Sequence, residues 1–260
     1  GVNLEAKDIN GHTPLQLAIQ NRQLAAIQAL LDKGVNLEAK DINGHTPLQL
    51  AAQYDYTEAI QALVDKGVNL EAKDNRDLTP LHLAAQYSHL AAIQALIDKG
   101  ANLEAKDRDD KTPLHWAASC GNLAAIQALV DQGANLEAKN KYDKTPLHLA
   151  ADHSHLVAVQ ALIDKGANIK AKDNMDGMTP LHLAAKKRHL AAIEALLDKG
   201  ADLETEDNNG WTLLHWAALN GHAAAVQTLV NKGANLEAKA KDGCTPRDLA
   251  TSSAIKSLLQ

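Results

Sequence analysis

The chain has 260 residues and a net charge of -6, and 45% of its residues are apolar although only 3% are aromatic. The negative charge argues against nucleic acid as the main partner, and no apolar run approaches the ~18 residues that a membrane span requires. Since phenylalanine is absent, the apolar residues are mainly Leu, Ala, Ile and Val. This composition favours thin layers of closely packed helices over one thick core.

A tetrapeptide of the type Thr-Pro-Leu-His recurs along the whole chain. Its threonines are 33 residues apart, except for a spacing of 34 between Thr145 and Thr179. They are Thr13, Thr46, Thr79, Thr112, Thr145, Thr179, Thr212 and Thr245. A period of this length predicts a solenoid, in which each repeat buries its apolar side against its neighbours.

Each repeat begins with a loop and the start of a first helix. In residues 74–106, turn-forming residues precede Thr79, a favourable N-cap that is followed by proline at the first helical position. His82 is at the third helical position, and Gln16 and Gln49 hold this place in the first two repeats. The Thr-x-x-Gln spacing is that of a capping box, so we expect the histidine column to start helices.

A second helix completes the repeat. It is expected from Leu90 to Lys99, where apolar residues recur at spacings of three, four and seven. Gly100 follows, and the uniform glycine at this place predicts a left-handed residue that ends the helix. The glycines are Gly1, Gly34, Gly67, Gly100, Gly133, Gly166, Gly200 and Gly233.

This repeat, with Thr-Pro-Leu-His-x-Ala at a 33-residue period, resembles the ankyrin repeat from end to end of the chain. The resemblance implies an all-α repeat solenoid of helix-turn-helix units joined by hairpin-like loops, with eight TPLH-type units in a single domain, 1–260. Residues 1–7 match the tail of a repeat, so we expect the chain to be part of a longer protein. The full repeats are expected at 8–40, 41–73, 74–106, 107–139, 140–172, 173–206 and 207–239, followed by a C-terminal cap at 240–260.

Three features depart from the family pattern. A loop place that is usually glycine carries aspartate in three repeats, a residue that tolerates left-handed backbone. The glycine usual between the two helices is kept only at Gly121 and Gly221. We therefore expect the other inter-helix turns to be strained or different in shape. The sixth repeat has an extra residue within 174–177, which we expect to bulge outward.

No metal, cofactor or catalytic site is predicted. One histidine per layer of ~10 Å cannot share a zinc ion, whose bonds to nitrogen are about 2.0–2.1 Å long. Cys120 is a lone thiol, and His153 holds the matching place one repeat later, but a surface thiol is favoured over a nucleophile. Cys120 and Cys244 are too far apart to pair, which fits a reducing compartment. We expect a non-enzymatic protein of the cytoplasm, or of a host's cytoplasm if the chain is a bacterial effector.

The resemblance also implies that the loop tips and the ends of the first helices line one concave groove, which binds a protein partner. Tyr54 and Tyr87 offer an aromatic anchor, and the fourth to sixth repeats offer more cations than carboxylates. Trp116 and Trp216 are expected to serve the core. The predicted binding residues are His12, His45, Tyr54, Leu78, Tyr87, Arg108, Lys111, Cys120, Lys144, His153, Met178, Lys186, Lys187 and Trp211.

The favoured function is a non-catalytic scaffold that holds an acidic or amphipathic protein segment in this groove, with no membrane insertion. One alternative is the targeting module of a larger enzyme or secreted effector. Another is an engineered array, although irregularities such as Leu213 in place of proline argue against consensus design. We expect a monomer, with self-association through the open N-terminal face as the alternative.

Overall fold

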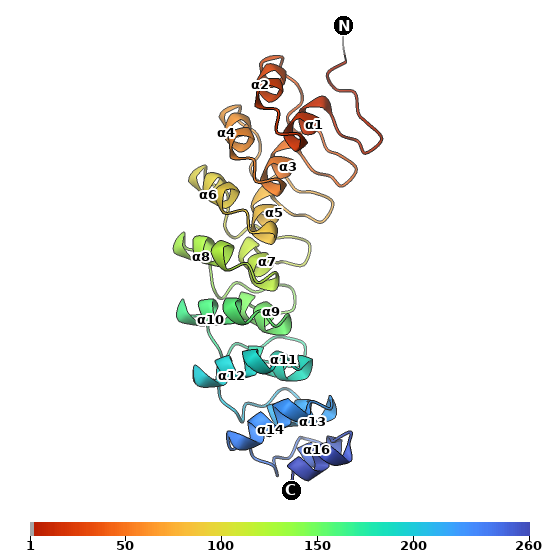
Figure 1. Ribbon diagram of the computed structural model, residues 1–260, viewed down its shortest axis with the longest axis vertical. Coiled ribbons are helices and arrows are strands. Elements are labelled where there is room, and N and C mark those ends of the chain that lie inside the picture. The colour runs from red at the N-terminus through yellow and green to blue at the C-terminus, as the bar shows by residue number, and fades with distance from the viewer. Residues whose placement is uncertain (1–2) are drawn as a thin grey trace. The chain divides into compact units, whose positions relative to one another are not determined.

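The computed structural model describes residues 3–260, in which helices and loops alternate and no strand occurs (Figure 1). The contacts divide the chain into an N-terminal part that ends at Asn135 and a C-terminal part that begins at Leu136. The helices of the N-terminal part are α1 Pro14–Gln20, α2 Leu24–Asp32, α3 Pro47–Gln53, α4 Thr57–Asp65, α5 Pro80–Tyr87, α6 Leu90–Asp98, α7 Pro113–Ser119 and α8 Leu123–Asp131. Those of the C-terminal part are α9 Pro146–Asp152, α10 Leu156–Asp164, α11 Pro180–Lys187, α12 Leu190–Asp198, α13 Leu213–Leu219, α14 Ala223–Asn231, α15 Pro246–Leu249 and α16 Ser253–Leu258.

The helices of each part form two rows. In the N-terminal part, α1, α3, α5 and α7 contact one another in turn, and α2, α4, α6 and α8 form the second row. In the C-terminal part, α9, α11, α13 and α15 form the first row, and α10, α12, α14 and α16 the second. The loops extend from the side of the odd-numbered helices (Figure 1). The all-α repeat architecture predicted from the sequence is confirmed.

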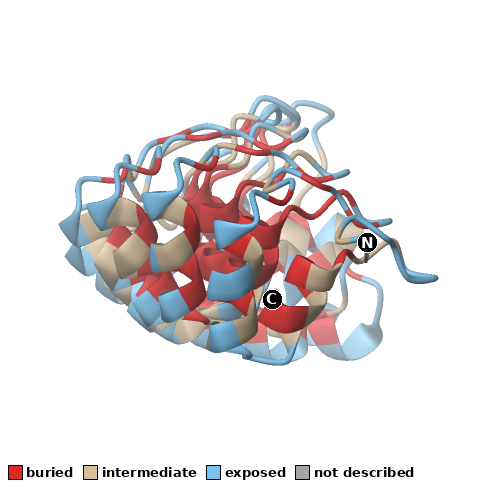
Figure 2. Cartoon of the chain, turned by 90° about the horizontal axis from the view of Figure 1, so that it is seen from above, coloured by how far each residue is buried: buried red, intermediate tan, exposed pale blue. Residues whose placement is uncertain are grey.

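The core of each repeat is one thin apolar layer between its two helices. Leu48 and Ala51 of α3 are buried against Ile60 and Leu63 of α4, and none of the four is more than 1% exposed. Buried residues gather between the helices, whereas exposed ones lie on the outer surface and on the loops (Figure 2). Since full burial of one Leu or Ile side chain contributes roughly 1.5–3 kcal/mol, even a thin layer stabilises the repeat when it is stacked on others.

The side chain at the third helical position both caps its own helix and binds the next repeat. His82 Nδ1 accepts the Thr79 N–H at 3.1 Å, so the ring proton is on Nε2, which donates to the Lys111 carbonyl at 3.0 Å. Gln49 does the same in the second repeat, because its Oε1 accepts the N–H of its own N-cap and its Nε2 donates to the Leu78 carbonyl. The predicted helix-start role is confirmed, and the bond to the next repeat is added to it.

These histidines are buried as neutral rings. Burial lowers the pKa of His148 to about 4, because a second proton would bring charge into the core. The ring accepts the N–H of its N-cap through Nδ1 and lies 3.1 Å from the Met178 carbonyl through Nε2. A second proton would also displace the bond to the N-cap.

A His148→Gln variant should resist acid better than the wild type, since Gln49 shows that glutamine can make both bonds. The unfolded chain takes up the proton near pH 6.5 and the folded chain only near pH 4. Stability is therefore fully present above pH 6.5 and falls as the pH drops toward 4, by at most about 3 kcal/mol for this one group. Urea unfolding at pH 7 and pH 4.5 measures the difference. Equal acid losses in both proteins would show that His148 is not the group responsible.

Left-handed residues end the second helices and form the turns between helices. The described glycines after the second helices have φ from 70° at Gly34 to 97° at Gly166, while Gly1 of this column lies outside the described residues. The aspartates in the usual glycine place of the loop are also left-handed, with φ from 54° to 62°. They are Asp77, Asp110 and Asp143.

The inter-helix turns keep one shape whatever their sequence. Gly121 and Gly221 have φ of 72° and 71°, and the five other residues at this place have φ from 51° to 69°. These are Arg22, Asp55, Ser88, Ser154 and Arg188. The expectation of differently shaped turns is wrong, because the two packed helices fix the turn and a non-glycine residue accepts a strain of roughly 1–2 kcal/mol there.

The repeated Asn-Leu-Glu-Ala-Lys segments bond each repeat to the next one. Glu38 Oε1 accepts the N–H of Asn69 at 2.9 Å, and Lys40 Nζ donates to the Lys73 carbonyl at 2.7 Å. Equivalent glutamate bonds recur in both parts, which accounts for the near-identity of these segments. In the fifth repeat Lys170 stands where the others have glutamate, so this link to the following repeat is missing.

Restoring that link should stabilise the C-terminal part. A Lys170→Glu/Asp202→Asn double variant recreates the glutamate and asparagine pair of the other repeats. We expect the free energy of unfolding to rise by about 1 kcal/mol, the usual size of a single exposed charge-assisted hydrogen bond. Urea denaturation measures this, with Asp202→Asn alone as the control. A double variant no more stable than that control would contradict the assignment.

The last repeat caps its first helix with a different residue. Asp248 replaces the histidine, and its Oδ2 accepts the N–H of Thr245 at 2.8 Å. The hydrogen bonds from Thr245 hold the pKa of Asp248 below its ordinary value. Asp248 is exposed, and α15 has only four residues, so the row of first helices ends on a polar surface.

The extra residue of the sixth repeat lengthens its loop. Asp173 Oδ1 accepts the N–H of Met178, five residues later, whereas the equivalent bond in the other repeats spans four residues. Met175 is exposed as a result. The expected outward bulge is confirmed.

Candidate functional site

The residue before each capping threonine and the last residues of each first helix lie on one side of the repeat. His12 Nε2 is 2.9 Å from Gln20 Nε2 at the end of α1, and Lys144 Nζ is 3.8 Å from Asp152 Oδ2 at the end of α9. The two sets of residues predicted from the sequence, at the loop tips and at the ends of the first helices, therefore lie beside each other. We call this side the loop face of each part.

Two of the predicted binding residues are not accessible on the loop face. Leu78 is 0% exposed and Met178 is 1% exposed, so neither can touch a partner. Both are corrections to the sequence-based set. An apolar chain at this place folds down onto the helices, whereas Lys111 and Lys144 carry their amines outward along the same surface.

The second and third repeats expose tyrosines at the ends of α3 and α5. Tyr54 is 39% exposed and Tyr87 is 45% exposed, and the Tyr87 ring stacks on His89 with centroids 5.8 Å apart. The residues before them, Gln53 and Gln86, each bury Oε1 without a hydrogen-bond partner. Adjacent repeats thus present the same pair, an exposed ring beside an unsatisfied acceptor. Sequence comparison found the tyrosines, but the unsatisfied oxygens depend on side-chain burial.

Cations gather over Trp116 in the N-terminal part. Its indole N–H donates to Asp107 Oδ2 at 2.9 Å, which fixes the ring, but Trp116 is only half-buried and does not lie in the core as expected. The Arg76 guanidinium and the Lys111 amine lie 5.7 Å and 5.2 Å from the ring centre. Their nearest carboxylate contacts, to Asp74 and Asp109, are both 3.8 Å long, so the two charges are only loosely compensated.

Two other predicted residues of the N-terminal part have local contacts. Arg108 is exposed and donates from its guanidinium to the Asn75 carbonyl of the preceding loop. Cys120 is an exposed free thiol, with Sγ 4.0 Å from Ser119 Oγ. Arg108 therefore adds charge near Arg76, while Cys120 adds only a small polarisable surface.

The C-terminal part has its own aromatic and basic cluster. The Trp211 and Trp216 rings are 4.9 Å apart, and the Lys186 amine is 4.5 Å from the centre of Trp216. Trp211 is therefore half-buried against its neighbour and is not a free loop tip. Trp216 donates to Asp207 Oδ2 at 3.0 Å, as Trp116 does in its own repeat.

The remaining predicted residues of this part are exposed or half-buried. Lys187 and His153 are exposed, and Lys144 is half-buried. His153 Nδ1 donates to the Leu149 carbonyl at 2.8 Å, and its ring stacks on His155. His153 is thus held by its own helix end.

Residues 3–260 contain no group of three or more His, Cys, Asp or Glu arranged to hold a metal ion. Nor is any helix in that range long and apolar enough to cross a membrane.

A hollow of about 540 Å³ lies on the opposite side of the N-terminal part, among α2, α4 and α6. It is lined by Leu24, Ala62 and Ala95 and by Gln and carboxylate side chains. The side chains that line this hollow do not form a cluster of converging polar groups like the one on the loop face.

Comparison with known protein families identifies this architecture. The family model for ankyrin repeats, in three copies, matches overlapping segments at 1–74, 35–107, 81–173, 135–207, 168–242 and 204–259. The chain belongs to the ankyrin repeat family. Ankyrin repeats form a general protein–protein interaction fold, so the ankyrin loop face is the natural place to consider a partner.

Solved ankyrin structures are similar over most of the chain. The ankyrin repeat domain of Bcl-3, described as a unique member of the IkappaB protein family, is 29% identical with a TM-score of 0.70, over 96% of this chain and 99% of that one. The human ASB11 ankyrin repeat domain is 27% identical with a TM-score of 0.72, over 83% of this chain and 97% of that one. No curated protein sequence matches the chain.

The burial of Leu78 can be tested against the exposure of Tyr87. Leu78→Ala should cost about 2–4 kcal/mol of folding free energy, because it leaves a cavity beneath the loop. Tyr87→Ala should cost less than about 1 kcal/mol, since its ring is largely exposed and stacks on a single side chain. Chemical denaturation of both variants measures the contrast, and equal costs would place Leu78 on the surface after all.

Proposed function

We propose that this ankyrin chain is a non-catalytic scaffold that holds an extended protein segment on the loop face of its N-terminal part. The observation that carries the proposal is the pair of exposed rings, Tyr54 and Tyr87, on adjacent repeats. Each ring follows a glutamine whose buried Oε1 lacks a hydrogen-bond partner, which costs roughly 1–3 kcal/mol, and an N–H of a bound segment would relieve that cost only after the glutamine side chain turned outward.

The spacing of the repeats suits an extended segment. Packed helices are about 8–10 Å apart, and an extended chain advances about 3.3 Å per residue. Every third residue of such a segment would therefore face a new repeat, with its N–H near a glutamine and its side chain near a tyrosine. Tyrosine is enriched among the residues that dominate binding energy, because it buries a large ring with little loss of entropy.

Charge indicates the kind of segment. Arg76 and Lys111 are loosely paired cations over Trp116, one to two repeats beyond the tyrosines. A segment with apolar or aromatic residues at one end and carboxylates at the other would match both features. We therefore propose an acidic or amphipathic segment. Lys144, Lys186 and Lys187 offer a separate basic surface on the C-terminal part.

We propose a non-catalytic role because the loop-face groups described above are held by structural contacts. Two free cysteines suit a reducing compartment, so we propose that the scaffold works in the cytoplasm. The chain could equally serve as the targeting module of a larger enzyme or effector, whose active domain would be found in the full reading frame.

Binding can be tested with a display library of unstructured peptides. We expect selected peptides to be acidic with an apolar anchor, and Tyr54→Ala/Tyr87→Ala to weaken their binding by about 100-fold, as loss of two hot-spot rings would. The matched control is Tyr142→Ala, which removes a tyrosine that is 38% exposed on a loop of the C-terminal part. Calorimetry or fluorescence anisotropy gives the affinities.

Charge reversal separates the contributions of the two parts. Arg76→Glu/Lys111→Glu should weaken binding and reduce its dependence on salt. Lys186→Glu/Lys187→Glu changes the basic surface of the C-terminal part, and a loss of affinity in that variant would show that this surface also contributes. If binding survives both the tyrosine and the Arg76/Lys111 changes, the segment does not lie on the proposed loop face. Loss of binding on substitution at Leu24 or Ala62 would place it in the hollow on the opposite side.

A further inference from the structure

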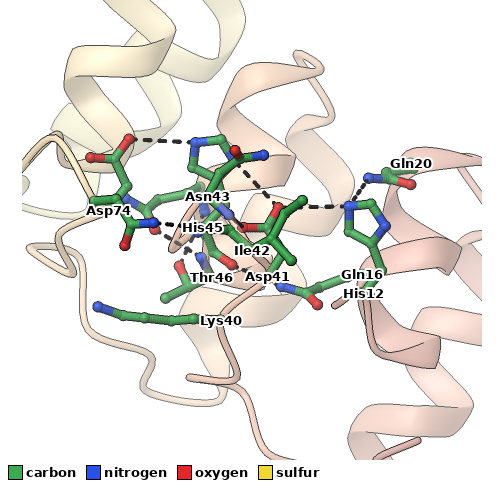
Figure 3. A network of polar contacts seen from close by, with 12 residues as sticks. His12, Gln16, Gln20, Lys40, Asp41, Ile42, Asn43, His45, Thr46 and Asp74 are labelled. Carbon is green, nitrogen blue, oxygen red and sulfur yellow. Dashed lines mark hydrogen bonds and ion pairs between the residues drawn. The ribbon is translucent and has the colours of Figure 1, made fainter. Parts of the chain in front are cut away.

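Three aspartates and two histidines alternate across the first three loops of the N-terminal part, and Figure 3 shows four of them, His12, Asp41, His45 and Asp74. His12 Nδ1 is 3.2 Å from Asp8 Oδ2, and its Nε2 is 3.6 Å from Asp41 Oδ2. His45 Nδ1 is 3.5 Å from the same Asp41 oxygen, and its Nε2 is 3.4 Å from Asp74 Oδ2. Each ring therefore lies between the carboxylate of its own loop and that of the next loop.

The loop amides themselves hold these carboxylates in place. Asp41 Oδ1 accepts the N–H groups of Asn43 and His45 at 2.9 Å and 2.8 Å, and Asp74 Oδ1 accepts two loop N–H groups in the same way. Burial by itself would raise the pKa of Asp74, but the bonds from His45 and from these loop amides outweigh it and lower that pKa. The second oxygen of each carboxylate is then left for the imidazole.

A neutral imidazole cannot satisfy two carboxylates, because it has one N–H donor and one acceptor nitrogen. At His12 the Gln20 amide nitrogen, 2.9 Å from Nε2, can donate to that ring nitrogen only while it carries no proton, so this contact favours the neutral ring. His45 has no such amide contact, and both of its ring nitrogens face carboxylate oxygens. In the neutral ring one lone pair points at a negative charge, whereas a second proton makes both contacts attractive.

We propose that Asp41, His45 and Asp74 form a proton-dependent clamp that binds the second and third loops together more tightly when His45 is protonated. The His45 side chain is 11% exposed and borders a cavity of about 190 Å³ that Asn75 and Arg76 also line, so protons can reach it. This device is independent of any partner, since it acts between loops of the same chain.

The other charged groups around the clamp act in both directions. Arg76 Nε is 3.8 Å from Asp74 Oδ2 and opposes a second positive charge on His45. Asp8 acts only at a distance, through His12. From the helix packed beside the loop, Gln16 Nε2 donates to the His45 carbonyl and is neutral. Two carboxylates in direct contact with the ring outweigh the one guanidinium that lies beyond them.

The next repeat supplies a matched substitution. Leu78 holds the place of His45 one repeat later and is fully buried there, so the fold accepts leucine at this position. His45→Leu therefore removes the titrating ring with little risk to folding. Asp41→Asn is the second variant, because its amide oxygen still accepts the loop N–H groups while the charge is lost.

Hydrogen-exchange protection factors of the loop amides, measured at pH 8 and pH 6 on the full chain, test the clamp. In the wild type we expect the amides of residues 43, 45, 76 and 78 to be roughly fivefold more protected at pH 6, the difference between a charged and a neutral hydrogen bond. His45→Leu should abolish this change and Asp41→Asn should reduce it. Amides of the loop at 107–111, which has no imidazole before its threonine, should not respond.

His12 also contacts Asp41, and the His45→Leu variant keeps that histidine, so a comparison with the wild type isolates the contribution of His45. His148 stays neutral between pH 8 and pH 6, since burial holds its pKa at about 4. Equal pH responses in wild type and His45→Leu, or no response in the wild type, would overturn the clamp. A response that disappears in His45→Leu but persists unchanged in Asp41→Asn would overturn the assigned carboxylate bridge.

Discussion

The buried side chain at the third helical position makes hydrogen bonds in two directions in the repeats before the last, and the stacking of the repeats depends on it. His82 closes the first turn of its own helix and also binds the carbonyl of the next loop. Removing it would leave a buried N–H and a buried carbonyl unsatisfied at once, each costing roughly 1–3 kcal/mol. Helix initiation and repeat stacking are therefore coupled in a single residue, which suits a fold in which each repeat is stabilised only by its neighbours.

The residue before each capping threonine shows how one backbone position can serve different purposes. Leucine or methionine there is buried, lysine extends over a tryptophan, and histidine lies between two carboxylates. The backbone is the same at His45, Leu78 and Lys111, because the loop aspartate accepts the same N–H groups in each of these loops. The chemistry of the side chain then decides whether the position adds to the core, to the binding surface or to the bonds between loops.

The loop aspartate has a similar double role. One carboxylate oxygen shapes its own loop, and the other faces the loop face, where it meets histidine, arginine or an indole N–H. Each repeat that carries this aspartate therefore neutralises an anion that its loop cannot do without, whereas the fifth repeat has the neutral Asn140 at this place. Where the neutralising group is a loosely paired cation, as at Arg76, charge remains available to a partner. Where it is an imidazole, the strength of the contact depends on pH.

The sequence by itself determined the fold of this protein, since the period of 33, the Thr-Pro cap and the glycine after each second helix are local signals that need no long-range information. It also identified the two sets of residues that meet on the loop face. Only the tertiary structure decided that Leu78 and Met178 are buried, that Trp211 packs on Trp216, and that Gln53 and Gln86 keep unsatisfied oxygens. The contact between His45 and Asp74 was also visible only in the tertiary structure. The reason is that burial and bonds between repeats depend on the atoms that the neighbouring layer places against a residue, and a pattern within one repeat does not contain them.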